Sequence, residues 1–232
     1  MNVDIATNLE RIRREVAAAC ARCGRDPASV RLIAVSKTHP AAAVIAAAAG
    51  GQRLFGESYV QEFLIKAGEV ALPVEWHFIG HLQSNKVRQL PGKVTMIHSV
   101  DRISLAEEID RQWGKAGLMA EVLIEVNLGG ESSKGGVAET ELEPLLRHLA
   151  TLRHLAVRGL MILPPYLADP EAVRPYFRRL RELAARVAAL GLPGVQMREL
   201  SMGMSHDFVV AIEEGATLVR VGTAIFGERG GR

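Results

Sequence analysis

The 232-residue chain has a net charge of only +2, and 48% of its residues are apolar, so it can bury a sizeable core. Its basic residues are spread along the sequence and not gathered with aromatic residues, which argues against a nucleic-acid-binding protein. No apolar run reaches the roughly 18 residues of a membrane span. Charged residues within the first 20 positions exclude a signal peptide, so we expect a cytoplasmic protein without a membrane partner.

The chain opens with a predicted amphipathic helix, in which apolar residues from Ile5 to Val16 recur at helical spacing. The only two cysteines, Cys20 and Cys23, close this helix. A redox pair usually follows a strand, and a zinc site needs a second pair of ligands. We therefore interpret the cysteines as small core residues or bystanders, and we expect no metal site.

Beyond this helix, short apolar runs alternate with stretches of helical periodicity, the clearest of which lie at 105–113, 142–149 and 173–187. The order, without a composition break or long linker, predicts one α/β domain over residues 1–232: a single (β/α)8 TIM barrel with an extra N-terminal helix. An open doubly wound sheet is the alternative, but no Gly-x-Gly-x-x-Gly turn follows the first strand. The eight predicted strands are 31–37, 53–57, 75–79, 94–99, 121–127, 157–162, 197–202 and 218–222.

The first strand delivers a lysine, Lys37, to its carboxyl end, just before Pro40 opens the next helix. In α/β proteins the loops at this end of the strands converge on a shared mouth, where chemistry is usually done. On position alone, a lysine that points to water explains the pattern equally well.

The last predicted strand ends in a second candidate feature, the turn at Gly222 and Thr223. Glycine lets the backbone approach a ligand closely, threonine adds a hydroxyl and an N–H, and loops after the last two strands are the usual phosphate site of this architecture. Ser201, at the end of the seventh strand, offers a further hydroxyl. An ordinary glycine turn with a capping threonine remains the alternative.

Together these two features are more informative than either alone. Burial in the mouth and a nearby cation such as Arg220 would both lower the pKa of Lys37 and free its amine to attack a carbonyl. A phosphate anchor opposite such a lysine suits a phosphorylated aldehyde, of which pyridoxal phosphate is the obvious example. The other strand ends bring Ser58, His77 and Met161 to the same predicted mouth.

Two weaker signals point elsewhere. His77 and His81 are four residues apart, but Phe78 stands where a zinc-protease helix needs glutamate, so metal binding is not supported. The glycine-rich segment 129–136 lacks the Gly-Lys-Ser/Thr order of a phosphate loop. We interpret it as a flexible loop over the mouth, with Lys134 in solvent.

Ordered motifs from the first strand to the last resemble those of the pyridoxal phosphate homeostasis proteins. They are IAVSKT at 33–38, FGESYVQE at 55–62, WHFIGHLQSNK at 76–86, HSVDR at 98–102, RGLM at 158–161, LSMGMS at 200–205 and VRVGTAIFG at 219–227.

The resemblance implies a barrel like the amino-terminal domain of alanine racemases, with pyridoxal 5'-phosphate held as an internal aldimine on Lys37. It further implies that Ser201, Gly222 and Thr223 hold the phosphate and that Arg220 lies by the pyridine nitrogen. Two positions depart from the family pattern: Ser58 stands where asparagine is common and His206 where an acidic residue is usual.

The resemblance favours a monomeric protein that buffers the cofactor, or delivers it to apo-enzymes, without robust turnover of its own. An arginine beside the ring nitrogen keeps its proton and leaves the ring a poor electron sink. We also expect no second domain of the kind that completes a racemase. A pyridoxal-phosphate-dependent amino-acid racemase is the alternative, and a cofactor-free lysine aldolase acting on sugar phosphates is a third hypothesis.

Overall fold

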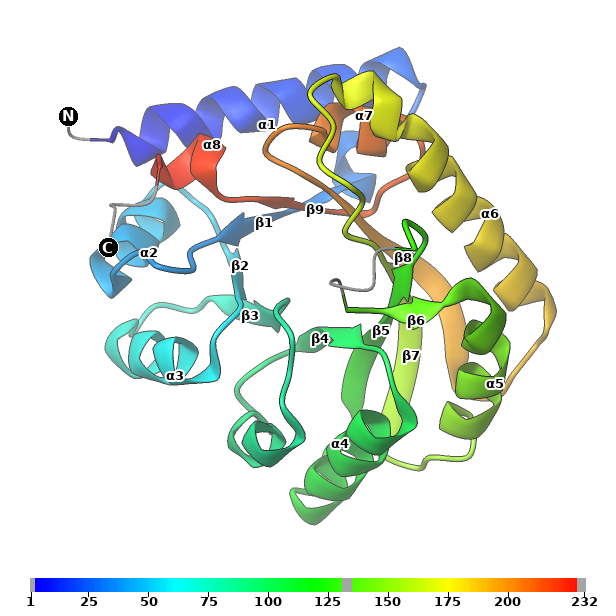
Figure 1. Ribbon diagram of the computed structural model, residues 1–232. Helices are drawn as coiled ribbons and strands as arrows, with labels where there is room; N and C mark the ends of the chain where they lie inside the picture. The colour runs from blue at the N-terminus through cyan, green and yellow to red at the C-terminus, as the bar shows by residue number, and fades with distance from the viewer. Residues whose placement is uncertain (1–2, 131–134, 229–232) are drawn as a thin grey trace.

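A computed structural model of the chain describes residues 3–130 and 135–228, so that part of the segment 129–136, including Lys134, lies outside the described residues. Within them, eight parallel strands close a barrel in the order β4, β3, β2, β1, β9, β8, β7, β5, and β4 also pairs with β5. Figure 1 shows these strands as a ring with the helices outside it. The strands are β1 (Arg31–Val35), β2 (Leu54–Glu57), β3 (Glu75–Phe78), β4 (Met96–Val100), β5 (Ala120–Asn127), β7 (Leu155–Met161), β8 (Val195–Met204) and β9 (Leu218–Val221).

The connections run mostly through helices that cover the outside of the ring. Between β3 and β4 the chain forms only a 3₁₀ segment, Ser84–Gln89, and β5 gains a short edge partner, β6 (Val137–Ala138), which the sequence did not predict. The helices are α1 (Ile5–Arg22), α2 (Ala41–Ala49), α3 (Val60–Glu69), α4 (Ile103–Lys115), α5 (Glu139–Leu149), α6 (Arg174–Ala189), α7 (Phe208–Glu213) and α8 (Thr223–Phe226). The predicted barrel with an extra N-terminal helix is confirmed.

Apolar residues fill both the inside and the outside of the barrel wall, as expected for parallel strands covered on both faces. Most helices press their buried faces against the outside of the wall. A smaller cluster of strand residues fills the barrel interior and forms the floor beneath the carboxyl ends of the strands. It consists of Ile33, Val35, Leu54, Met96, Leu123, Met161 and Leu218.

The N-terminal helix α1 lies along α7 and α8. The side chain of Asp4 caps it by accepting a hydrogen bond from the N–H of Thr7 at 3.0 Å. Farther along, the amide of Asn8 donates to the carbonyl of Ile225 at 2.9 Å. Cys20 is buried on its inner face, whereas Cys23 is exposed, and both thiols are free. No helix among the described residues is long and apolar enough to cross a membrane.

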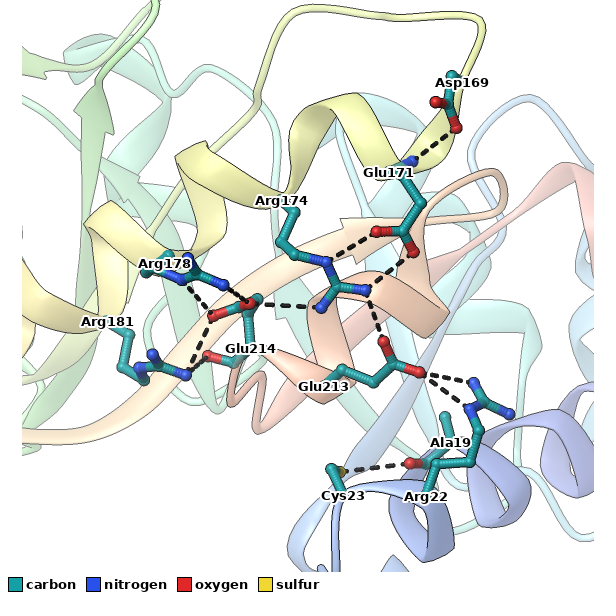
Figure 2. Close-up of polar contacts among 10 residues, drawn as sticks. All are labelled: Ala19, Arg22, Cys23, Asp169, Glu171, Arg174, Arg178, Arg181, Glu213 and Glu214. Atoms are coloured by element: carbon teal, nitrogen blue, oxygen red, sulfur yellow. Dashed lines mark hydrogen bonds and ion pairs between the residues drawn. The ribbon is translucent and has the colours of Figure 1, made fainter.

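An ion-pair cluster joins α6 to the end of α7 and to α1, as Figure 2 shows. The carboxylate of Glu214, only 5% exposed, lies within 3.3 Å of the guanidinium groups of Arg174, Arg178 and Arg181. Burial raises the pKa of Glu214, but the hydrogen bonds from Arg178 and Arg174 outweigh it and hold the pKa below its usual value. Because the residues come from separate segments, this cluster fixes α6 against α7.

Candidate functional site

A cavity of about 840 Å³ opens at the carboxyl ends of the strands. Five of the residues predicted from the sequence line it: Lys37, Ser58, Arg220, Gly222 and Thr223. Its wall also includes Glu125, His81, Lys86, Tyr59, Tyr166, Leu163, Ser205 and His206. The fold therefore brings the strand-end lysine and the closing glycine turn to one site.

The backbone of β1 explains why Lys37 faces the cavity. Side chains alternate along a strand, and Ile33 and Val35 point into the barrel interior, so Lys37 continues the same face beyond the strand end. The turn that follows is tight, because the N–H of His39 donates to the carbonyl of Ser36 at 3.0 Å. Thr38 adopts φ +68°, a left-handed conformation that costs a non-glycine residue about 1–3 kcal/mol.

The closing turn gathers polar groups beside Lys37, not across the mouth from it as predicted, because β9 pairs directly with β1 and Val221 is the register partner of Ala34. The hydroxyl of Ser205 accepts hydrogen bonds from the N–H groups of Gly222 at 3.2 Å and Ala224 at 3.4 Å. A Cβ atom at Gly222 would lie 3.2 Å from the carbonyl oxygen of Val35, so a side chain there would crowd the end of β1. The turn thus keeps a bare backbone and two hydroxyls, those of Ser205 and Thr223, at the cavity.

Arg220 brings a buried cation to the same cavity. It is 4% exposed, and its guanidinium donates to the hydroxyl of Ser201 at 2.5 Å and to the carbonyl of Ile162 at 2.8 Å. Burial lowers the pKa of Arg220 to about 10, although Asp207 and Glu125 oppose the shift. The guanidinium therefore keeps its proton at neutral pH and offers only donors.

A chain of buried hydrogen bonds continues from Arg220 into the barrel. Ser201 Oγ lies 2.9 Å from His98 Nδ1, and His98 Nε2 lies 2.9 Å from His77 Nδ1. Burial and then Arg31 lower the pKa of His77 to about 3, and burial together with His77 and Arg220 holds the pKa of His98 well below its usual value. Both rings are neutral, so each has one donating and one accepting nitrogen, which lets both hydrogen bonds of the chain form.

Three predicted site residues do not line the cavity. Ser201 is fully buried and its hydroxyl is shared between Arg220 and His98, one layer below the cavity wall. His77 and Met161 are 2% and 1% exposed and lie inside the barrel. The serine after β8 that lines the cavity is Ser205, because β8 runs to Met204, two residues beyond its predicted end.

Glu125 is a cavity residue that the sequence reasoning missed. Its side chain is 5% exposed, and burial, with a smaller contribution from Asp101, raises the pKa of this carboxyl to about 7 against the opposing effect of Arg220. The available signal was the single carboxylate within the otherwise apolar stretch 122–126 of β5. A carboxyl that titrates near neutral pH thus faces the cavity beside a permanent cation.

The two positions that depart from the resembling family both lie at the cavity. His206 Nε2 lies 3.1 Å from the carbonyl oxygens of Leu167 and Ala168, and its ring is 5.2 Å from the ring of Tyr166. Ser58 lies against Gly80, where an added Cβ would come within 2.3 Å of the Ser58 carbonyl oxygen. The glycine at position 80 therefore lets the loop after β3 pack directly on the loop after β2.

Comparison with known proteins places this geometry in a family. The model of the alanine racemase N-terminal domain matches residues 7–230. The pyridoxal phosphate homeostasis protein of Aquifex aeolicus is 49% identical over 222 residues, which cover 95% of this chain and 96% of that protein. The chain belongs to the pyridoxal phosphate homeostasis protein family. A second member, from Pseudomonas aeruginosa, is 47% identical over 227 residues, covering 97% of this chain and 96% of that protein.

Solved structures separate this family from the enzymes that share its barrel. PipY of Synechococcus elongatus, determined with pyridoxal phosphate bound, has a TM-score of 0.85 and 39% identity, covering 96% of this chain and all of that one. The alanine racemase of Corynebacterium glutamicum has a TM-score of 0.72 at 19% identity, covering 98% of this chain and 64% of that one. At this identity the likeness to the alanine racemase concerns the fold alone.

Proposed function

We propose that this protein binds pyridoxal 5'-phosphate reversibly at Lys37 and buffers or delivers it, in vitamin B6 and amino-acid homeostasis, without robust turnover. The observation that carries the proposal is that Lys37, Arg220 and the bare turn at Gly222 line one cavity. PipY, a close structural relative, has been solved with this cofactor.

The residues present fit the cofactor by charge and shape. Lys37 and Arg220 line the cavity together with the turn at Gly222, where the absence of a Cβ lets the backbone lie close to the end of β1. We assign the amine that holds the aldehyde to Lys37 and the phosphate contacts to the Gly222–Thr223 turn. The Ser205 hydroxyl joins that turn in place of Ser201, which is buried below it.

When bound, pyridoxal phosphate supplies an electron-withdrawing ring and a reactive aldehyde. The chain's own contribution is to hold that group and to limit its chemistry. Arg220, protonated at neutral pH, would offer N–H donors to the ring nitrogen without giving up its proton, which would leave that nitrogen neutral. Ser201, His98 and His77 fix the guanidinium from below, so Ser201 and His77 act through Arg220.

The partners in this proposal are pyridoxal phosphate and the apo-enzymes that take it up, with the carrier itself monomeric. Transfer is tested by mixing the loaded protein with an apo-enzyme and following the activity that enzyme regains. An amino-acid racemase of the same barrel would instead erase the optical activity of an amino acid at catalytic protein levels. A change no larger than the protein concentration supports the carrier.

The test of binding is a titration with pyridoxal phosphate, followed by the absorbance of the lysine-bound cofactor. We expect the wild type and Lys93→Ala, which removes an exposed lysine, to saturate at one cofactor per chain, and Lys37→Ala to show no such band. A Lys37→Ala protein that keeps the band and the stoichiometry contradicts the assignment.

A further inference from the structure

The turn that carries Lys37 is held from one side by a buried ammonium. Lys66, on α3, has a side chain that is only 4% exposed. Its Nζ lies 2.6 Å from the carbonyl oxygen of Ser36, 2.7 Å from Glu57 Oε1 and 2.6 Å from Glu62 Oε1. All three N–H bonds of the ammonium are thus used, and one of them fixes the residue before Lys37.

The same cluster holds the turn from the other side. Glu62 Oε1 also accepts the N–H of Thr38, the residue after Lys37, at 2.5 Å. Thr38 has φ +68°, a conformation that a β-branched residue rarely adopts unless its surroundings impose it. Glu57 completes the arrangement by accepting the hydroxyl of Ser36 at 2.6 Å.

A purely stabilising role explains this cluster poorly. The desolvation of buried ions offsets most of their attraction, and Glu57 is fully buried with its second oxygen, Oε2, lacking a hydrogen-bond partner among the described residues. What the cluster does achieve is geometric. It fixes the backbone on both sides of one residue, and that residue faces the cavity.

We propose that Lys66 and Glu62 are positioning residues for Lys37: by holding Ser36 and Thr38, they keep the turn in the strained conformation that directs the Lys37 amine into the cavity. This inference rests on the proposed function, in which Lys37 holds the cofactor. Without Glu62, Thr38 relieves its backbone strain by leaving φ +68°. The fraction of protein whose Lys37 amine points into the cavity then falls.

The test uses Glu62→Ala, Thr38→Gly and the double variant, with Glu143→Ala as the matched control. Glu143 forms an i,i+4 ion pair on α5 with Arg147, as Glu62 does on α3 with Lys66, but both members of the α5 pair are exposed. We expect Glu62→Ala to weaken cofactor binding about tenfold and to slow borohydride labelling of Lys37. The double variant should recover most of this loss, because glycine adopts positive φ without strain. Glu143→Ala should bind as the wild type does.

Each outcome separates the proposals. Glu62→Ala that binds within twofold of the wild type overturns the positioning role, and so does a loss that Thr38→Gly does not recover. A wild-type protein that forms no band at Lys37 contradicts the proposed function instead. If Glu62→Ala fails to fold, Glu62→Met, which keeps a side chain of similar length but removes the carboxylate that Thr38 and Lys66 contact, should weaken binding in the same direction. Unchanged binding by that variant also overturns the role.

Discussion

Replacing Glu125 by glutamine should change how the stability of the cofactor-free protein depends on pH. The folded protein holds the pKa of this carboxyl at about 7, mainly by burial, against 4.5 for an unperturbed glutamate. Between these values the native state binds the proton that the unfolded chain has released. The free energy of unfolding therefore falls by about 1.4 kcal/mol per pH unit as the pH rises.

This stabilisation of about 3 kcal/mol is fully present below pH 4.5 and is lost completely above pH 7. Glutamine keeps the shape and loses the titration, so Glu125→Gln should gain stability relative to the wild type as the pH rises from 5 to 8. Urea unfolding at several pH values measures this difference, with Glu143→Gln on the exposed face of α5 as the control. A difference between wild type and Glu125→Gln that stays constant across the range refutes the reasoning.

Two further substitutions test the turn and the ion-pair cluster. Gly222→Ala places a Cβ 3.2 Å from the Val35 carbonyl oxygen, so the turn and the end of β1 must move apart slightly. We expect this shift of the turn to lower cofactor affinity about tenfold, which is about 1.4 kcal/mol, and to lower the melting temperature slightly. Unchanged affinity would show that the turn does not approach the cofactor. Glu214→Ala leaves three arginines without their shared carboxylate, so it should lower the free energy of unfolding by roughly 1–3 kcal/mol. The exposed control Glu143→Ala should lower it by less than about 0.5 kcal/mol. Since the pKa of Glu214 is lowered, its contribution to stability should disappear as the pH falls. Equal effects of Glu214→Ala and Glu143→Ala at neutral pH would contradict the stabilising role of Glu214.

The order of strands and helices was predictable because each strand is buried on both faces and reads as a short apolar run. All eight predicted strands lie within two residues of their observed bounds. The edge strand β6 was not predictable, since two residues that pair beside the end of β5 carry no periodic signal.

The depth of each side chain in the barrel was harder to predict than its strand. The register between β8 and β9 shifts between Ser201 and Met204, and β8 continues to Met204, so the serine of this segment that lines the cavity is Ser205 and not Ser201. Lys37 was placed correctly because β1 is regular and simple alternation extends past its end. The Lys66 cluster was not predictable for another reason: Lys66 contacts Ser36, 30 positions away, and Glu62 contacts Thr38, 24 positions away, and local sequence patterns carry no information on such contacts.

The most direct test of the central claim is to reduce the cofactor-loaded protein with borohydride and to locate the attached pyridoxyl group by peptide mass analysis. The account predicts one group per chain, on the peptide that contains Lys37. A group on another lysine, such as Lys86 at the outer wall of the cavity, or no attached group at saturating cofactor, would contradict it.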